Sequence, residues 1–264
     1  MGIKINDKKT IDPFQKLKNE HSNIKKVIAV TSGKGGVGKS MVTASLATAL
    51  ADKGLKVGIM DADITGPSIP KMFGLKGMME SDGEALFPFE TNKGIKVVSI
   101  NLLVKDETEP VLWRGPVIGT VVKQFFGDVY WGDLDVLLID MPPGTGDVPL
   151  TVFQSIEIDG TIIVTSPQEL VKVIVSKAYN MATKMKIDVL GVIENFSYMT
   201  CPDCGKKIQV FGESHIQETA SEMNIDVLGQ IPIIPAMAGS ADAGDFDNVE
   251  NKYLDKAIEK IINL

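Results

Sequence analysis

Apolar residues gather in short runs along the chain, and these runs predict buried β-strands. They lie at 27–31, 57–60, 95–100, 135–140, 160–165 and 189–193, each bounded by polar or turn-forming residues. In most of them apolar residues follow one another instead of alternating with polar ones. We therefore expect strands of a parallel sheet with both faces covered.

Between these runs, apolar residues recur at the spacing of an α-helix. Helices are predicted from Met41 to a stop at Gly54, from Pro116 to Phe125, over 168–185 and over 249–264. The alternation of strands and helices predicts right-handed βαβ units. The expected fold class is α/β, with a single-domain parallel sheet flanked by helices on both faces.

We assign residues 25–264 to this one domain, because no change in composition marks a second one. Residues 1–24 are a polar, lysine-rich N-terminal extension. In it, Asp12 followed by Pro13 favours a short helix, with Phe14 and Leu17 on one face, packed loosely on the domain. A flexible arm is the alternative. Residues 74–94 carry glycine, methionine and acidic residues without a period, which predicts a long excursion or a hairpin.

The loop after the first strand fits the phosphate-binding template G-x-x-x-x-G-K-[ST] at every fixed position. Its glycines let backbone N–H groups point at phosphate oxygens, and the following helix adds the positive end of its dipole. Lys39 would reach the β- and γ-phosphates, and the Ser40 hydroxyl would ligate Mg²⁺. The predicted nucleotide-binding residues are Gly33, Lys34, Gly35, Gly36, Val37, Gly38, Lys39, Ser40 and Met41.

Carboxylates end two of the predicted strands, at the sheet edge where α/β proteins bind ligands. Asp61 is placed for the outer shell of Mg²⁺, and Asp63 to orient the attacking water or accept its proton. The alternative is that both only cap the next helix. Asp140 would hold Mg²⁺ through a water. The loop 141–147, with two prolines before two glycines, is a candidate switch beside the γ-phosphate.

The composition narrows the class of protein. A net charge of −7 over 264 residues argues against general nucleic-acid binding, which needs clustered lysine and arginine. The chain contains no run of about eighteen apolar residues, so no membrane span is predicted, and the N-terminus does not resemble a secretory signal. The chain has two cysteines, which indicates a reducing compartment, so we expect a cytoplasmic protein.

Cys201 and Cys204 are separated by two residues and followed by Gly205, a spacing that turns two thiolates toward one metal. A closed zinc or iron–sulfur site usually needs about four protein ligands. The two histidines, His21 and His215, are interpreted as ordinary residues, with His215 as a less favoured third ligand. Two copies of the chain related by a two-fold axis would supply four thiolates. Zinc bridging the dimer, a redox dithiol and incidental free cysteines are the alternatives.

Several motifs together resemble the Mrp/ApbC family of iron–sulfur carrier ATPases. They are Gly33–Ser40, Asp61–Ser68, Trp113–Pro116, Asp140–Asp147, Glu194–Asn195 and the Cys201-x-x-Cys204 pair. The likeness covers nearly the whole predicted domain. It departs at Thr65, where the family usually has tyrosine.

The resemblance implies a slow ATPase that forms a homodimer. Such a dimer holds a labile [4Fe–4S] cluster at the subunit interface and passes it to apo-proteins. It implies that Cys201 and Cys204 ligate the cluster, and that Asn195 contacts the adenine with Pro232 beside it. Lys34 resembles the extra lysine of the MinD and ParA relatives, which crosses a dimer interface to the partner's nucleotide. The expected catalytic residues are Lys34, Lys39 and Asp63.

A MinD- or ParA-like positioning ATPase is the main alternative, with a zinc-bridged ATPase as another. A MinD-like positioning ATPase would carry a terminal amphipathic helix with a basic polar face for anionic lipid. Acidic and basic residues balance over 249–264. We therefore expect this helix to pack on the domain and the protein not to bind membranes.

Overall fold

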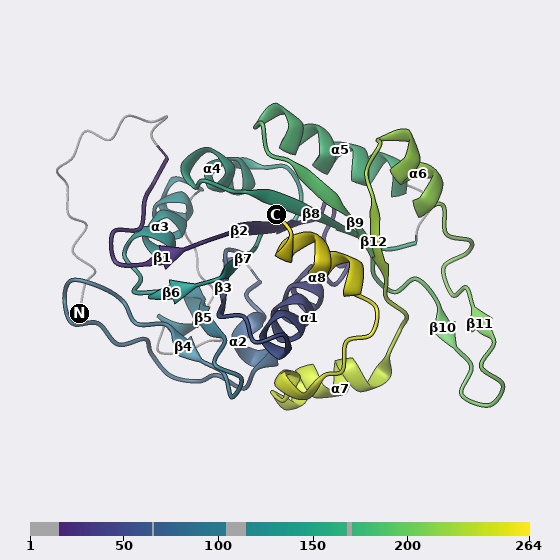
Figure 1. The fold of residues 1–264 in the computed structure, drawn as a ribbon, viewed down its shortest axis with the longest axis horizontal. Helices are drawn as coiled ribbons and strands as arrows, with labels where there is room; N and C mark the ends of the chain where they lie inside the picture. The colour runs from purple at the N-terminus through teal and green to yellow at the C-terminus, as the bar shows by residue number, and fades with distance from the viewer. Residues whose placement is uncertain (1–15, 65, 104–114, 168–170) are drawn as a thin grey trace.

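An eight-stranded sheet runs through the middle of the described chain, which covers residues 16–64, 66–103, 115–167 and 171–264 of a computed structural model (Figure 1). Neighbouring strands pair in parallel, except at one edge where β4 runs antiparallel to β5. In spatial order the strands are β12 (Val227–Gln230), β9 (Val189–Glu194), β8 (Gly160–Thr165), β2 (Val27–Thr31), β7 (Val136–Asp140), β3 (Val57–Asp61), β5 (Lys96–Val98) and β4 (Phe89–Glu90).

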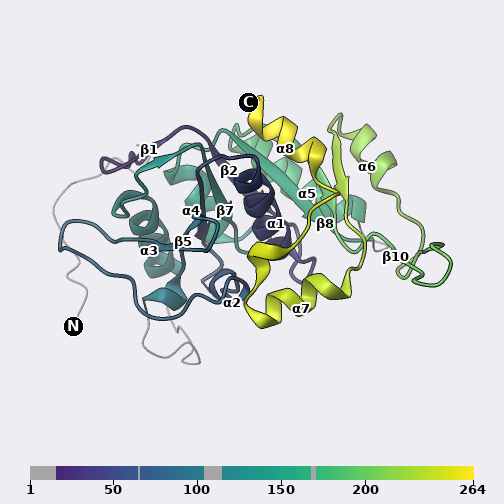
Figure 2. The same ribbon diagram turned by 60° about the horizontal axis from the view of Figure 1, so that its bottom comes forward.

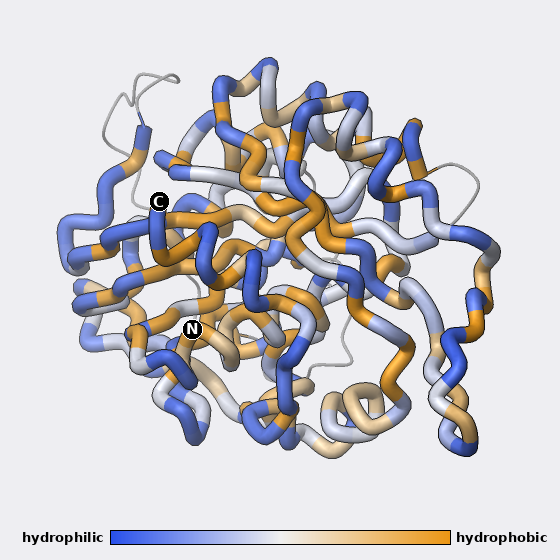
Figure 3. The backbone as a smooth tube through the Cα atoms, turned by 45° about the vertical axis from the view of Figure 1, so that its right-hand side comes forward, coloured by the Kyte–Doolittle hydropathy of each residue, from blue (hydrophilic) through white to orange (hydrophobic). Residues whose placement is uncertain are grey.

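The apolar runs form the core strands, as the sequence predicted. Every residue of β2, β3 and β7 is buried. Figure 3 shows these apolar segments through the middle of the molecule, with polar segments around them. The run at 95–100 differs from expectation, because β5 ends at Val98 and Ile100–Leu102 form the 3₁₀ helix η1. Ile100 and Leu102 are still buried, so they fill the core on a different backbone.

Helices cover both faces of the sheet, which confirms the α/β fold class. On one face lie α1 (Lys39–Asp52), α2 (Ile69–Met72), α7 (Pro235–Ala243) and α8 (Asp255–Ile262). On the other lie α3 (Gly115–Gly127), α4 (Asp147–Ser155), α5 (Val171–Lys184) and α6 (Ile216–Glu222) (Figures 1 and 2). The stop predicted after α1 is confirmed, since Gly54 has a φ of +83°.

Four of these helices were given no range in the sequence analysis, namely α2, α4, α6 and α7. In α4 the pattern was obscured by Pro149, which lies in the first turn. A proline is tolerated there because the first backbone N–H groups of a helix have no partner inside it. Pro235 begins α7 in the same way.

The C-terminal helix packs on the domain, as expected. It is shorter than predicted and begins at Asp255, after Val249 and Leu254 have already entered the core. Ala257, Ile258 and Ile261 of α8 are buried beside β12 and α1. Within the described ranges, no helix is long and apolar enough to cross a membrane.

Residues 16–24 of the N-terminal extension are extended and hydrogen-bonded to the domain. Leu17 forms a parallel bridge with Ile156, and the Lys16 ammonium donates to the carbonyls of Phe153 and Ile156, each at 2.8 Å. Further on, β1 (Asn23–Ile24) pairs in parallel with β6 (Asp133–Leu134). The helix expected near Asp12 and Pro13 lies mostly outside the described residues, as do Thr65, Trp113 and Arg114. The domain boundary at residue 24 stays a prediction.

Two excursions leave the sheet. The stretch 74–94 leads into an antiparallel hairpin of β4 and β5, which confirms the hairpin alternative. The second excursion follows β9, where β10 (Met199–Thr200) and β11 (Lys207–Ile208) form a small antiparallel hairpin. It projects from the β12 side of the molecule, away from the helical layers (Figure 1). We call residues 197–214 the cysteine hairpin, because Cys201 and Cys204 lie in its turn.

Candidate functional site

The phosphate-binding loop connects β2 to α1 and lines a cavity of about 240 Å³. Lys34 to Met41 all line this cavity, together with Ser32, Asp63, Ser68, Met72 and Pro143. Gly33 instead packs on α5, where an added Cβ would lie 2.3 Å from the carbonyl oxygen of Ile174. The structure therefore brings together every residue predicted for this loop, with Gly33 acting through close packing.

Gly38 shows why the loop needs glycine at its last position before the lysine. Its φ is +75°, a conformation that side chains with a Cβ adopt at a cost. An added Cβ would also lie 2.2 Å from Asn195 Nδ2 and 3.0 Å from Phe196 Cζ. The loop is thus held tightly against the residues that follow β9.

Asp140 is the centre of the polar contacts at this site. Its carboxylate is fully buried and accepts hydrogen bonds from Lys39 Nζ at 2.7 Å, Ser40 Oγ at 2.6 Å and Thr43 Oγ1 at 2.8 Å. Lys39 is itself 6% exposed, so this is a buried ion pair. A buried charge that loses its partner is strongly destabilising. The Lys39 ammonium is therefore held beside Asp140, at the phosphate-binding loop.

Asp61 lies beside Asp140, because the two residues are register partners at the ends of β3 and β7. Burial, and next the negative charge of Asp140, raise the pKa of Asp61 to about 8. Lys39 and a 3.1 Å hydrogen bond from Ser99 Oγ oppose this shift. Asp63, two residues on, donates its backbone N–H to Asp61 Oδ1 and lines the cavity.

The donors at this edge fit a magnesium ion. Ser40 offers a hydroxyl and Asp61 and Asp140 offer carboxylates, and Mg²⁺ prefers such oxygen ligands. The two carboxylates are adjacent and share one cation, Lys39, and their mutual repulsion raises the pKa of Asp61. A divalent cation is the species that such a pair would accept in place of a proton.

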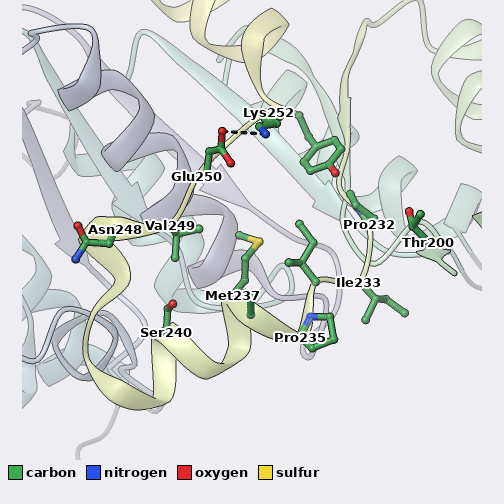
Figure 4. Close-up of a pocket in the computed structure, with 13 residues that line it drawn as sticks. Thr200, Pro232, Ile233, Pro235, Met237, Ser240, Asn248, Val249, Glu250 and Lys252 are labelled. Carbon is green, nitrogen blue, oxygen red and sulfur yellow. Dashed lines mark ion pairs between the residues drawn. The ribbon is translucent and has the colours of Figure 1, made fainter. Parts of the chain in front are cut away.

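Two residues expected near the base lie in different places. The Asn195 side chain is 1% exposed and donates to the Val37 carbonyl at 3.0 Å, so it braces the phosphate-binding loop. Pro232 lines a separate pocket of about 440 Å³ between α7, the chain at 248–253 and the loop after β12 (Figure 4). Contacts of either residue with adenine stay predictions.

Cys201 and Cys204 lie together at the turn of the cysteine hairpin. The turn is closed by Gly205 N–H to the Cys201 carbonyl and by Cys201 N–H to the Lys206 carbonyl, both at 2.9 Å. Gly205 has a φ of +70°, as the knuckle spacing requires. Hydrogen bonds from the backbone N–H groups of Cys204 and Asp203 lower the pKa of the Cys201 thiol. These bonds stabilise the Cys201 thiolate, which is the metal-binding form.

The described residues bring no third cysteine, histidine or carboxylate to this pair. His215 is exposed and its Nδ1 lies 3.4 Å from a carboxylate oxygen of Glu218 in α6. Cys204 and residues 205–213 are exposed, among them the apolar Ile208, Val210 and Phe211. One copy of the chain thus presents two thiols on a projecting, partly apolar hairpin.

Sequence reasoning missed several contributors to the nucleotide site. Thr43 lies one turn after Ser40 on α1, and Ser99 follows β5 next to β3, so both positions carried a polar residue on a buried edge as a signal. Ser32 precedes the loop, and its buried hydroxyl has no hydrogen-bond partner among the described residues. Ser68 and Met72 reach the cavity through the tertiary fold, whereas Pro143 belongs to the loop 141–147 that was predicted to lie beside the γ-phosphate.

Comparison with known proteins places the chain in a family. Residues 23–264 match the profile described as "ParA: NUBPL iron-transfer P-loop NTPase". A protein of Clostridium perfringens named "Iron-sulfur cluster carrier protein" is 50% identical over 226 residues, which cover 83% of this chain and 79% of that one. A protein of Pyrococcus furiosus with the same name is 44% identical over 246 residues, covering 89% and 83%.

Solved structures agree with the fold. A nucleotide-binding protein from Archaeoglobus fulgidus, in complex with ADP and with cobalt, is 46% identical, with a TM-score of 0.78 over 86% of this chain and 90% of that one. The cell division ATPase MinD of Pyrococcus furiosus has a TM-score of 0.64 at 21% identity, covering 90% and 99%, which shows a shared fold alone.

The loop at 33–40, its carboxylates and the cysteine pair thus occur in a chain matched over almost its whole length. The chain belongs to the NUBPL iron-transfer P-loop NTPase family, as the resemblance to Mrp/ApbC proteins predicted.

Proposed function

We propose that the protein is an ATP-dependent iron–sulfur cluster carrier. Two copies would hold one [4Fe–4S] cluster as cargo between them and deliver it to apo-proteins, with slow ATP hydrolysis controlling the exchange. One observation carries this proposal. The chain combines a phosphate-binding loop and its cavity with a thiol site to which the described residues bring two ligands, Cys201 and Cys204.

The nucleotide part rests on the geometry of the loop. Lys39 would neutralise the β- and γ-phosphates, and the buried Ser32 hydroxyl, which lines the same cavity, supplies an additional donor. Asp63 lines the cavity near Asp61 and would orient the attacking water or accept its proton. Ser40, Asp61 and Asp140 would hold Mg²⁺, which when bound neutralises charge that develops on the phosphates.

Lys34 supports the dimer. It is exposed on the loop and lines the phosphate cavity, so a partner's nucleotide that approached this face could be reached by the Lys34 side chain. Dimerisation and ATP binding would then stabilise each other, because each partner's triphosphate gains a cation from the other chain. The exposed cysteine hairpins would meet in the same dimer.

The cluster part rests on the two thiols. A [4Fe–4S] cluster takes four thiolate ligands, and two hairpins would supply Cys201 and Cys204 twice. The lowered pKa of Cys201 favours its thiolate, the form that ligates iron. An exposed hairpin also suits a carrier, since an apo-protein must approach the cluster to receive it.

A positioning ATPase is less well supported. A MinD-like ATPase would carry a free amphipathic helix, whereas Ala257, Ile258 and Ile261 of α8 are buried beside β12 and α1. The likeness to MinD shows the fold and no membrane activity.

Anaerobic reconstitution with iron and sulfide tests the carrier proposal. We expect a broad visible absorbance, about two iron atoms per chain, and loss of both in Cys201→Ala and Cys204→Ala. Cluster transfer to an apo-protein is followed by the recovery of that protein's activity. ATP turnover is measured in the same samples, with Lys39→Ala expected to abolish it while leaving the thiols unchanged. Iron uptake that survives Cys201→Ala, or a site that takes zinc and no cluster, would refute the carrier function.

A further inference from the structure

Glu194 is a buried carboxylate whose hydrogen-bond partners, among the residues that the structure describes, are all neutral. It is the last residue of β9 and has an exposed fraction of 0%. Within the described ranges no lysine, arginine or histidine forms an ion pair with it. Its charge is held by neutral donors instead, and a buried charge is tolerated only with such hydrogen bonds.

These donors come from both stems of the cysteine hairpin. Ser197 Oγ, before β10, donates to Glu194 Oε2 at 2.5 Å, and Ser214 Oγ, after β11, lies 2.8 Å from each carboxylate oxygen. Gln230 Nε2, at the end of β12, donates to Oε2 at 2.9 Å. It also lies 3.2 Å from Ser197 Oγ and 3.4 Å from Ser214 Oγ. One carboxylate thus ties the two ends of the hairpin to each other and to the sheet.

Away from its stems, the hairpin is exposed to solvent. Residues 202–213 are all exposed, and the β10–β11 pairing joins only Met199 to Ile208 and Thr200 to Lys207. The direction in which Cys201 and Cys204 point is therefore set at the stems, where Ser197 and Ser214 meet Glu194.

The next two residues hold the nucleotide site. Asn195 donates to the carbonyl of Val37 in the phosphate-binding loop, and Phe196, with a φ of +57°, packs against Gly38. Three consecutive residues therefore contact the hairpin stems, the loop carbonyl and the last loop glycine. A displacement of the phosphate-binding loop would therefore act on residues 194–196, the same segment that holds the cysteine hairpin.

The first stem is tied to the second pocket as well. Ser197 N–H donates to the Ile231 carbonyl at 2.8 Å, and Ile233 N–H donates to the Tyr198 carbonyl at 2.7 Å. These bonds flank Pro232, which lines the pocket of Figure 4. Thr200 of β10 lines the same pocket. The hairpin is thus bonded to both sides of the region predicted to receive a nucleotide.

We propose that Glu194 is a positioning residue that links the nucleotide site to the cysteine pair, by holding both hairpin stems beside the residues that hold the phosphate-binding loop. The inference rests on the proposed function and adds to it the element through which nucleotide binding would alter the cluster ligands. It requires that hairpin and loop move together, which is a statement about coupling and can be measured as such.

Thiol labelling measures this coupling without any cluster. The full chain is labelled with iodoacetamide under anaerobic conditions with and without Mg·ADP, and the rates at Cys201 and Cys204 are read by peptide mass spectrometry. Light scattering at the labelling concentration verifies a single oligomeric state, so that the rate reports the hairpin and not subunit association. In the wild type we expect Mg·ADP to change the labelling rate by about fivefold or more.

Glu194→Gln keeps the size of the side chain and removes its charge and one acceptor oxygen. We expect it to reduce the nucleotide effect on labelling to less than about twofold while the dissociation constant for Mg·ADP stays within about threefold of the wild type. Glu213→Gln is the matched control, because Glu213 is an exposed carboxylate beside Ser214 in the sequence. The Ser214 hydroxyl bonds to Glu194 and not to Glu213. Glu213→Gln should keep the full nucleotide effect.

If Glu194 had a merely structural role, Glu194→Gln would lower stability but leave unchanged the ratio of the labelling rates with and without Mg·ADP. If Glu194→Gln does not fold, Ser214→Ala removes one stem contact and should reduce the same ratio. The inference is overturned if either folded variant keeps the wild-type nucleotide effect, or if the wild type shows none. Cluster reconstitution is scored separately, so a failure of this coupling leaves the carrier function standing, and a failure of reconstitution leaves the labelling result standing.

Discussion

Asp61→Asn is expected to stabilise the nucleotide-free fold at neutral and alkaline pH. Burial, together with the charge of Asp140, raises the pKa of Asp61 from 3.8 to about 8. Over this range the folded chain keeps a proton that the unfolded chain has lost. Asparagine has the shape of the protonated acid and cannot ionise, and its carbonyl oxygen can still accept a hydrogen bond from the Asp63 N–H.

The sign and size follow from linkage between proton binding and folding. Because the pKa of Asp61 is raised on folding, its stabilising contribution is fully present below the unfolded pKa of 3.8 and is lost as the pH rises toward 8. Within this window one proton changes the free energy of unfolding by about 1.4 kcal/mol per pH unit. Between about pH 6 and pH 8 the wild type therefore loses about 2–3 kcal/mol from this one carboxyl.

Urea unfolding from about pH 5 to pH 9, in EDTA and without nucleotide, measures this directly. The difference in the free energy of unfolding between Asp61→Asn and the wild type should rise with pH and become flat near pH 8. Asp242→Asn, at an exposed position of α7, is the control and should run parallel to the wild type. A difference for Asp61→Asn that does not depend on pH would refute the reasoning, because it would mean that Lys39 keeps both carboxylates ionised.

Three further predictions concern the loop, the thiols and the tail. Gly38→Ala should weaken Mg·ATP binding, measured by calorimetry, by more than about tenfold, and Gly36→Ala should weaken it by clearly less. Both glycines have a positive φ, but of the two only Gly38 has atoms within 4 Å of an added Cβ. Equal losses of affinity in the two variants would contradict the role of the Asn195 contact. Alkylation of Cys201 should reach half its maximal rate at a lower pH than alkylation of glutathione does, because backbone N–H groups lower the pKa of the Cys201 thiol. The same midpoint pH for both thiols would argue against the hydrogen bonds from Asp203 and Cys204 to Cys201. Ile258→Ala should lower the free energy of unfolding by about 2–4 kcal/mol in urea, since this side chain is 3% exposed, whereas a cost near zero would mean that α8 is not part of the core.

The sequence was most informative where a local structure or a ligand restricts which residue types can occupy a position. Apolar runs such as 27–31 and 135–140 predicted their strands because short runs of consecutive apolar residues are typical of strands with both faces covered. The phosphate-binding loop was predictable to the residue, since its fixed glycines and Lys39 serve one kind of ligand. The carboxylates at strand ends followed from the same topology, and the structure places Asp61 beside Asp140.

Contacts between distant segments could not be predicted. Glu194 was recognised as part of a motif, but its partners Ser197, Ser214 and Gln230 are ordinary polar residues whose meeting depends on the hairpin and on β12. The role of Asn195 as a brace for Val37 depends in the same way on the sheet order, in which β8 separates β9 from β2. Short helices such as α6 and α7 have too few turns for their apolar spacing to stand out.

The central claim is that one chain supplies half of a cluster site. Native mass spectrometry of the anaerobically reconstituted protein tests it most directly, because it reports chains and iron in the same particle. The account predicts a particle of two chains with a single [4Fe–4S] cluster, absent when Cys201 is replaced by alanine in both chains. A single chain that carries its own complete cluster would contradict it.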